Sequence, residues 1–213
     1  MRVAVVLYDF IEPIELAAVG TLSMATRLSD KLCYFTVSPT KDILTLQNGL
    51  RVQADFSFDD APEADVVIVT GGPGWKRQAE NAQMLNFLRQ RHAAGACIAS
   101  VCTGALLLAA AGLLTGKRAT TKMPVTGAEQ CPLETMRETY PDIKATPALV
   151  VDEGNVVTGG GVTLGVDLTL YLLGRFLGEP VARETARIME YSASSAANRA
   201  RLPTIVSETA LAA

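Results

Sequence analysis

The stretch that decides the fold is Ala96-Cys97-Ile98-Ala99-Ser100-Val101-Cys102-Thr103-Gly104-Ala105-Leu106-Leu107-Leu108. Its first part is a short apolar run, typical of a buried strand, that stops at Cys102. Small residues follow, and an apolar helical pattern continues to Gly112. A thiol at the point where a buried strand turns directly into a helix predicts a strand–nucleophile–helix elbow. The unpaired amides and the positive dipole end at the start of such a helix favour the thiolate over the thiol.

Cys102 also has a simpler interpretation, because free cysteines are often inert, small members of a hydrophobic core. Its position at the tip of a strand, with Thr103-Gly104 opening the next helix, favours a functional thiol instead. We therefore take Cys102 as the candidate nucleophile and ask which other residues the fold would bring to it.

Length and composition predict one α/β domain. The chain has 213 residues, of which 49% are hydrophobic, and its formal net charge is −3. This charge offers no basic patch for nucleic acid, and no apolar run is long enough to span a bilayer. The N-terminus enters a strand pattern at once, without the features of a signal peptide. We therefore expect a cytoplasmic protein with no nucleic-acid or membrane partner.

The cysteines and the single histidine argue against a disulfide framework or a metal site. Four cysteines lack paired spacing, which fits a reducing compartment. No CxxC is present, and His92 is the sole imidazole. His92 falls near the C-terminal end of a predicted helix, where a solvated side chain complements the helix dipole. We expect no metal, no cofactor and no catalytic role for His92.

Strands alternate with helices through most of the chain. Apolar runs predict strands at 2–8, 32–37, 65–69 and 96–101, and helical patterns occur at about 14–28, 82–94 and 163–177, with a last helix ending near Tyr191. This alternation predicts a single doubly wound, mostly parallel sheet with helices on both faces. We expect a domain over residues 1–191 and a C-terminal tail over residues 192–213.

Three further segments have local signatures. Residues 43–53 predict a hairpin around Asn48-Gly49 that lies half exposed at a sheet edge. Residues 148–158 predict a second, tight hairpin. The span 123–140 is helical in outline, opened by Pro124 and divided into two helices by Pro132.

Two groups of residues follow predicted strands and should face the crevice at the carboxyl ends of the sheet. Glu15 follows the first strand, although an acid in a first helical turn is also explained by the helix dipole. Gly71-Gly72-Pro73-Gly74 follows the strand at 65–69. These glycines let backbone approach a ligand and could present an oxyanion-type donor, or they form a plain turn. Gly159-Gly160-Gly161 is a further place for close approach.

This combination of residues resembles the ThiJ/PfpI superfamily, which has a flavodoxin-like, class I glutamine amidotransferase-like fold. The elements that carry the resemblance are Glu15, Gly71–Gly74, Ser100–Gly104, Leu106–Thr121, Val157–Asp167 and Met189–Tyr191, over residues 2 to about 191. Within the superfamily, Ser-Val-Cys-Thr-Gly-Ala followed by Gly-Lys-Arg-Ala-Thr-Thr most resembles isonitrile hydratases. It equally resembles the amidase-like sensor domains of AraC-type transcription regulators.

The chain departs from the superfamily's patterns at several points. Family proteases and amidotransferases place a histidine within reach of the nucleophile, whereas Thr103 follows Cys102 here. Those activities therefore lose their general base. Hydratase-like relatives usually have His-Trp where this chain has Lys122-Met123, and often Asp where it has Glu15. Regulator relatives continue into a DNA-binding helix-turn-helix region, for which we expect no room before Ala213.

The resemblance implies an isonitrile hydratase-like lyase acting on a small molecule. In this hypothesis the Cys102 thiolate adds to the electrophile and Glu15, kept protonated by a raised pKa, donates the proton. The amides of Gly72 and Thr103 would stabilise negative charge, the Thr103 hydroxyl could assist, and Gly71 and Gly160 would line the pocket.

Other functions stay open. A reactive thiol would also suit a redox or ligand sensor. Glyoxalase- or deglycase-type activity usually needs a histidine as well, and a plain binding module is a further alternative. Family members are commonly dimers, so we expect a homodimer, with the hairpin at 43–53 as a candidate interface.

Overall fold

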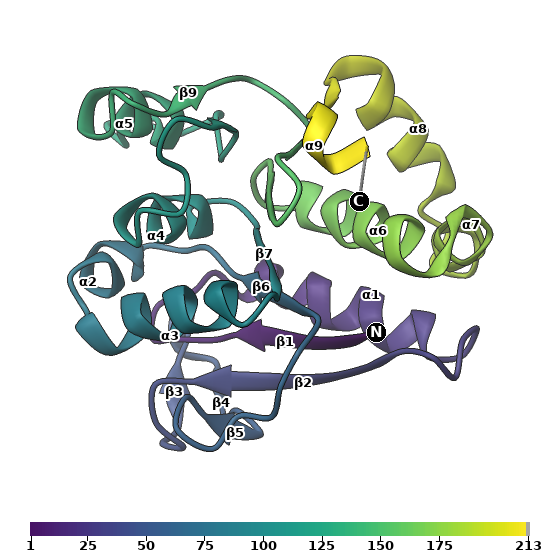
Figure 1. The fold of residues 1–213 in the computed structure, drawn as a ribbon, viewed down its shortest axis with the longest axis horizontal. Coiled ribbons are helices and arrows are strands. Elements are labelled where there is room, and N and C mark those ends of the chain that lie inside the picture. The colour runs from purple at the N-terminus through teal and green to yellow at the C-terminus, as the bar shows by residue number, and fades with distance from the viewer. Residues whose placement is uncertain (212–213) are drawn as a thin grey trace.

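The computed structural model describes residues 1–211, without the side chains of Thr209 and Leu211 (Figure 1). Its centre is an eight-stranded sheet with the order β12-β10-β11-β7-β6-β1-β2-β5. The strands are β1 (Arg2–Val6), β2 (Cys33–Ser38), β5 (Phe56–Ser57), β6 (Val66–Val69), β7 (Cys97–Ser100), β10 (Val150–Asp152), β11 (Val156–Gly159) and β12 (Thr204–Val206). All pairings are parallel except that of β10 with β11. The predicted mostly parallel α/β fold is confirmed.

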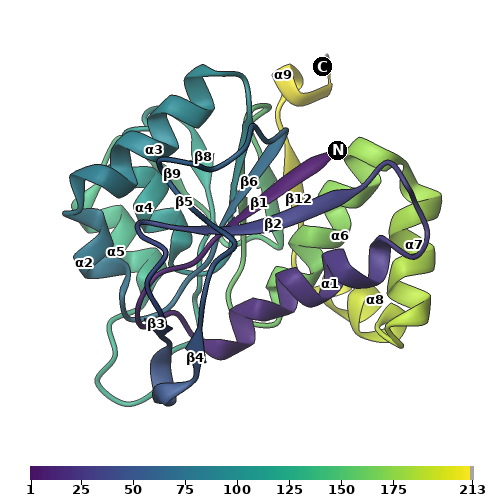
Figure 2. The same ribbon diagram turned by 90° about the horizontal axis from the view of Figure 1, so that it is seen from below.

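Helices cover both faces of this sheet. They are α1 (Ala17–Ala25), α2 (Trp75–Ala79), α3 (Ala82–Ala93), α4 (Gly104–Ala110), α5 (Pro132–Thr139), α6 (Leu164–Leu177), α7 (Glu179–Ile188), α8 (Ser192–Arg201) and α9 (Glu208–Leu211). Figure 2 shows α2, α3, α4 and α5 on one side of the sheet and α1, α6, α7 and α8 on the other. Within residues 1–211, no helix combines the length and the apolar character needed to cross a membrane.

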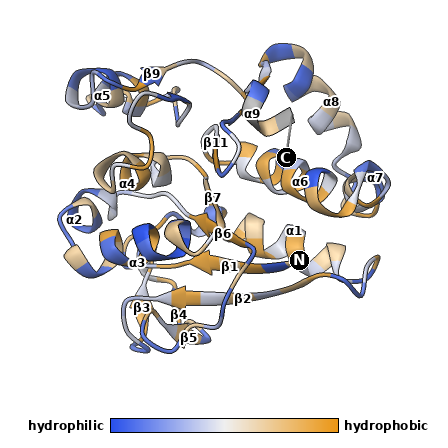
Figure 3. Cartoon of the chain, viewed as in Figure 1, coloured by the Kyte–Doolittle hydropathy of each residue, from blue (hydrophilic) through white to orange (hydrophobic). Residues whose placement is uncertain are grey.

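The core lies between the central strands and these two helical layers. Every residue of β6 and β7 is buried, as is every residue of β1 after Arg2. Because both faces of a parallel sheet are covered, such strands need apolar residues at every position rather than at alternate ones. Figure 3 shows the contrast with α3, along which hydrophilic residues (blue) alternate with hydrophobic ones (orange). Burial on both faces is the reason why the central strands were predictable from their apolar runs.

The first helix begins differently from the prediction of a helix at 14–28. A 3-10 turn, η1 (Pro13–Leu16), precedes α1, and the Glu15 amide donates to the Glu12 carbonyl oxygen at 2.9 Å. Pro13 begins η1, because a first turn does not need the N–H that proline lacks. This tighter turn, rather than an α-helix, carries Glu15.

The predicted hairpin at 43–53 exists, but not at the edge of the main sheet. β3 (Leu44–Thr45) and β4 (Arg51–Val52) pair antiparallel in a sheet of their own, joined by the 3-10 turn η2 (Gln47–Gly49). The Phe10 amide donates to the Thr45 carbonyl oxygen at 2.9 Å. The hairpin therefore binds the loop after β1, and β5 takes the edge of the main sheet.

The prediction of two helices over 123–140 is wrong in its first half. Residues 123–131 form neither helix nor strand. Pro132 begins α5 instead of dividing a helix, because proline is tolerated in a first turn and not in a helix interior. On either side of this segment, β8 (Arg118–Ala119) and β9 (Lys144–Ala145) pair in a small parallel sheet.

The segment after residue 191, which the sequence predicted to be a tail, contributes to the main sheet. It forms α8, β12 and α9, and β12 pairs in parallel with β10. A strand of three residues at a sheet edge has too few positions to show a period, so the sequence did not reveal it. Residues 212 and 213 of the predicted tail lie outside the described part of the chain.

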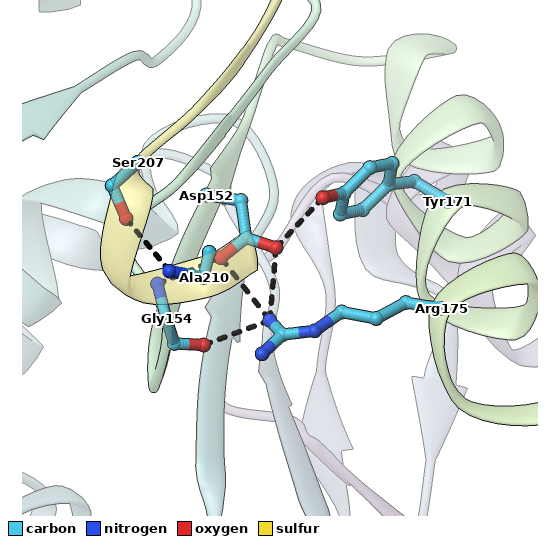
Figure 4. A network of polar contacts seen from close by, with 6 residues as sticks. All are labelled: Asp152, Gly154, Tyr171, Arg175, Ser207 and Ala210. Atoms are coloured by element: carbon cyan, nitrogen blue, oxygen red, sulfur yellow. Dashed lines mark hydrogen bonds and ion pairs between the residues drawn. The ribbon is translucent and has the colours of Figure 1, made fainter. Parts of the chain in front are cut away.

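Asp152 joins β10 to α6 through its buried carboxylate, as Figure 4 shows, and to the C-terminal segment through its main-chain carbonyl oxygen. Asp152 is 1% exposed and accepts hydrogen bonds from the Tyr171 hydroxyl at 2.7 Å, from Nη1 of Arg175 at 2.9 Å and from the Gly154 amide at 2.8 Å. The Ser207 amide donates to the Asp152 carbonyl oxygen at 2.8 Å. Because a buried charge needs both a counter-ion and hydrogen bonds, this network holds the edge of the sheet together.

We predict that Arg175→Met destabilises the protein by about 3 kcal/mol, because it leaves the buried Asp152 carboxylate without its counter-ion. Chemical denaturation would measure the loss. The double variant Asp152→Asn/Arg175→Met should be more stable than the single one, since its buried side chain carries no charge. Arg187→Met, which removes an exposed ion pair with Glu184, is the matched control and should leave the midpoint nearly unchanged. Equal effects of Arg175→Met and Arg187→Met would contradict the prediction.

Candidate active site

Cys102 occupies a strained corner between β7 and α4. Its φ is 55°, a left-handed conformation that is uncommon for a residue other than glycine. The Cys102 amide donates to the Gly160 carbonyl oxygen at 3.1 Å, and the Thr121 hydroxyl donates to the Cys102 carbonyl oxygen at 2.6 Å. Backbone in such a conformation persists only where its surroundings hold it. The predicted strand–nucleophile–helix elbow is therefore present, and hydrogen bonds fix it from two sides.

The end of β6 lies against this elbow so closely that glycine is required. A Cβ at position 104 would lie 2.3 Å from the carbonyl oxygen of Val69 and 2.8 Å from that of Thr70. A Cβ at Gly71 would lie 2.7 Å from the Cβ of Cys102. Because β6 and β7 are neighbouring parallel strands, Gly71 and Cys102 lie together at the carboxyl edge of the sheet.

Glu15 reaches the same point from η1. It is 2% exposed, and its carboxyl group lies close enough to the Cys102 thiol for each group to shift the pKa of the other. The Gly71 amide donates to Glu15 Oε2 at 3.4 Å, whereas Oε1 has no hydrogen-bond partner among the described residues. Glu15 and Cys102, which the sequence placed in one crevice, therefore form a buried acid pair.

The backbone amides of Thr103 and Val162 act on the Cys102 sulfur, and each lowers the pKa of the thiol. The Thr103 amide was expected there, whereas Val162 was not. Val162 has φ 57° and follows Gly159-Gly160-Gly161, the run that the sequence marked as a place where backbone approaches the crevice. The glycine run was thus the available signal, although it could not identify the donor.

The pKa values of Glu15 and Cys102 agree with the prediction for the acid and disagree with it for the thiol. Burial raises the pKa of Glu15 from 4.5 to about 7, in the predicted direction, while the neighbouring Cys102 thiol lowers it. Burial and the nearby Glu15 charge raise the pKa of Cys102 from 9.0 to about 12, despite the two amides. The prediction that the resting sulfur is a thiolate is therefore wrong, because desolvation outweighs the helix dipole and the amides. Near neutral pH the Cys102 thiol therefore keeps its proton, and the Glu15 carboxyl group lies close to its own pKa.

The predicted role of Gly72 as a free amide donor is contradicted by its hydrogen bond. The Gly72 amide donates to Thr103 Oγ1 at 2.8 Å, and Thr103 Oγ1 lies 3.3 Å from the Gly72 carbonyl oxygen. The amide and the hydroxyl therefore satisfy each other. This contact holds the loop after β6 to the start of α4 and leaves the Thr103 amide for the sulfur.

The other predicted positions fall around this centre or away from it. Gly71 and Gly160 contact Glu15 and Cys102 through their backbone, as described above. His92 lies on α3, and the prediction of a solvated side chain is wrong, because its Nε2 atom is buried without a hydrogen-bond partner among the described residues. The sequence did not suggest Tyr8, whose pKa is raised by burial first and then by the nearby charges of Glu15 and Cys102. Its hydroxyl donates to the Thr70 carbonyl oxygen at 2.8 Å. In residues 1–211 no group of three or more His, Cys, Asp or Glu side chains is arranged to hold a metal ion.

Comparisons with known proteins agree with this architecture. The DJ-1/PfpI family model matches residues 1–174. An isonitrile hydratase of Pseudomonas putida is 37% identical over 156 residues, covering 71% of this chain and 64% of the relative. The HTH-type transcriptional regulator GbdR of Pseudomonas aeruginosa is 31% identical over 177 residues, covering 82% of this chain and 46% of the relative.

More distant similarities include an enzyme and a solved structure. The deglycase PfpI of Pyrococcus furiosus is 28% identical over 88 residues, covering 40% of this chain and 53% of the relative. The crystal structure of a ThiJ/PfpI family protein from Pseudomonas syringae superimposes with a TM-score of 0.77 at 27% identity, covering 89% of this chain and 74% of that one. The chain thus spans about half to two thirds of the length of these curated relatives.

We predict that two glycine-to-alanine changes have opposite effects, although both glycines lie in helices. Gly104→Ala should destabilise the protein by about 2 kcal/mol, because the new methyl group meets the backbone of β6. Gly20→Ala in α1, where a Cβ has nothing within 4 Å, should stabilise it by about 0.5–1 kcal/mol through helix propensity. Thermal denaturation of both variants tests this, and a Gly104→Ala protein as stable as the parent would contradict the close approach.

We predict that burial of Glu15 makes stability depend on pH. Because its pKa rises from 4.5 to about 7 on folding, the native state holds this proton more tightly than the unfolded chain. The stability of the parent relative to Glu15→Gln should therefore be greatest below pH 4.5 and fall by about 3 kcal/mol as pH rises to about 7. Urea denaturation over this pH range measures the difference. Parallel curves for the two proteins would show that Glu15 titrates normally.

Proposed function

The chain belongs to the DJ-1/PfpI family, and we propose that it is a cysteine-dependent enzyme that adds water to a small electrophile. The reaction class that we favour is that of an isonitrile hydratase, a lyase. The observation that carries the proposal is the burial of the Glu15 carboxyl group beside the Cys102 thiol at the elbow, close enough for each group to shift the pKa of the other. The 37% identity to the Pseudomonas putida isonitrile hydratase supports this choice within the family.

The first step moves the thiol proton of Cys102 to Glu15. Near pH 7 the Glu15 carboxyl group is close to its pKa, so it can accept the thiol proton as the sulfur attacks. The sulfur–carbon bond forms at the terminal carbon of the isonitrile while the sulfur–hydrogen bond breaks. Glu15 then delivers the same proton to that carbon, which gives a thioimidate bound to Cys102. In this mechanism Glu15 acts first as a base and then as an acid, whereas the amino-acid sequence suggested only a proton donor.

The second step releases the product. Water adds to the thioimidate carbon and loses a proton to Glu15, and the carbon–sulfur bond then breaks. The sulfur recovers a proton from Glu15, the nitrogen gains the second hydrogen of the water molecule, and an N-substituted formamide leaves. The amides of Thr103 and Val162 stabilise the sulfur whenever it carries negative charge. Single donors of this kind contribute about 3 kcal/mol in other enzymes.

Burial limits the size of the substrate. Glu15 and Cys102 are each 2% exposed, so the reacting carbon must enter an enclosed site. The terminal carbon of an isonitrile is small and linear with its nitrogen, which suits such a site. An amide of a peptide would need more room and a histidine base, which supports the exclusion of protease and glutamine amidase activities.

The alternatives have different support. A ligand sensor is supported by the similarity to GbdR, although this chain covers only 46% of that regulator. A thiol-based redox sensor is less favoured, because the raised pKa of Cys102 opposes formation of the reactive thiolate. Deglycase-type activity is supported by similarity over only 40% of this chain.

We retain the homodimer and the cytoplasmic location as proposals. Four exposed hydrophobic residues lie in this region: Phe10 in the loop after β1, Ile14 in η1, and Ile43 and Leu50 beside or within the hairpin that binds this loop. Covering them is the physical reason for a second copy.

We predict that Cys102→Ala abolishes hydration of small isonitriles, and that Glu15→Gln lowers kcat about 100-fold or more because the proton carrier is lost. Assays of formamide production, with α-oxoaldehydes as a second substrate class, measure this. Cys97→Ala is the matched control: Cys97 is a buried cysteine in β7 that lies outside the pair, so turnover should persist.

Full activity of Cys102→Ala would contradict the mechanism. An inactive parent that nevertheless binds an isonitrile in calorimetry would favour the ligand sensor. Turnover of α-oxoaldehydes alone would favour the deglycase-type alternative.

A further inference from the structure

Lys122 lies next to the backbone that surrounds Cys102. The preceding residue, Thr121, donates its hydroxyl hydrogen bond to the Cys102 carbonyl oxygen at 2.6 Å. A Cβ at Gly161 would lie 2.7 Å from both the Cβ and the Cγ of Lys122. Gly161 immediately precedes Val162, whose amide lowers the pKa of the Cys102 thiol. The stem of Lys122 therefore packs on the turn that supplies this amide, and its positive charge acts on the pair by lowering the pKa of Glu15.

Lys122 forms an ion pair with Glu129, which belongs to an exposed segment of the chain. The Lys122 Nζ atom lies 2.6 Å from Glu129 Oε1, and the two side chains are 19% and 43% exposed. Glu129 belongs to residues 124–130, which are all exposed and form neither helix nor strand. Ion pairs of this partly exposed kind contribute little net stability, so another carboxylate can replace the one from Glu129. Lys122 is thus held near Glu15 and Cys102, whereas its counter-ion Glu129 lies on an exposed segment and is easier to displace.

The electrostatics of the acid pair also call for such a cation. At neutral pH Glu15 and Cys102 carry between them up to one negative charge in a buried site. A substrate that is itself an anion would be repelled from this site unless a positive group met its charge. Lys122 is the cationic side chain that acts on Glu15, and an ammonium group binds a carboxylate through charge-assisted hydrogen bonds.

We propose that Lys122 binds a carboxylate of the substrate in place of Glu129, so that the substrate is a small electrophile bearing a carboxylate group. This inference rests on the proposed function and names its substrate class. An isocyano acid would place its terminal carbon at Cys102 and its carboxylate at Lys122. A neutral isonitrile of equal size would lack the second contact and would bind more weakly.

The test compares isocyanoacetate with its neutral methyl ester. The parent should prefer the acid, and Lys122→Met should lower the acid-to-ester ratio of kcat/KM about tenfold, mainly through KM, since a hydrogen bond to a charged group is lost. Glu129→Gln should lower KM for the acid about threefold, because it removes the competing carboxylate. Lys144→Met, a change at an exposed lysine on β9, is the matched control and should leave the ratio intact.

The outcomes separate this inference from the proposed function. If the parent hydrates both compounds and Lys122→Met leaves their ratio intact, whether or not both rates fall, then Lys122 does not select the carboxylate and the inference fails alone. If the parent hydrates neither compound, the proposed function fails. Calorimetry of isocyanoacetate with Cys102→Ser and with Cys102→Ser/Lys122→Met then decides the inference: loss of binding in the double variant supports it, and equal or absent binding in both overturns it.

Discussion

The close contact between the end of β6 and the start of α4 is the constraint on which the site depends. The carbonyl oxygens of Val69 and Thr70 occupy the space that any side chain at position 104 would need. Gly104 therefore lets the two central strands end side by side, which turns Cys102 into a left-handed corner and aims it at the crevice. A wider separation would move the thiol away from Gly71 and Glu15. The elbow is thus a consequence of packing between strands, and its strain is held by the hydrogen bonds from Thr121 and to Gly160.

Magnitudes explain why the thiol keeps its proton at rest. A helix N-terminus favours a negative charge by about 0.3–1 kcal/mol at ordinary exposure. The rise of the Cys102 pKa from 9.0 to about 12 corresponds to roughly 4 kcal/mol in the opposite direction, with burial as its largest cause. Burial therefore decides the protonation state of Cys102, and the thiolate forms only when Glu15 takes the proton. Burial also raises the pKa of Glu15 to about 7, a value at which a carboxyl group exchanges protons readily near neutral pH.

The sequence was sufficient wherever a pattern was local or repeated. The apolar runs identified β1, β6 and β7, and the fold rule for parallel strands then brought Glu15 and Cys102 to one edge. The sequence was insufficient wherever a tertiary contact determines the local structure. The Gly72 amide looked free, but the Thr103 hydroxyl accepts it, and Val162 supplies a donor because Gly159-Gly160-Gly161 folds back on the elbow. The strand β12 depends on an existing edge at β10, and such a three-residue strand has no signature of its own.

Two of the three carboxylates that are buried in residues 1–211, Asp152 and Glu15, have opposite surroundings. Asp152 lies at the edge of the sheet opposite to the elbow, because β10 runs antiparallel to β11, and donors engage both of its oxygens. Glu15 lies at the elbow edge, and within residues 1–211 one of its oxygens has no hydrogen-bond partner and neither oxygen forms an ion pair with an arginine or lysine. Asp152 thus meets an arginine and donors on both oxygens, which suits a structural role, whereas burial with fewer donors raises the pKa of Glu15 to about 7, where it can bind and release a proton.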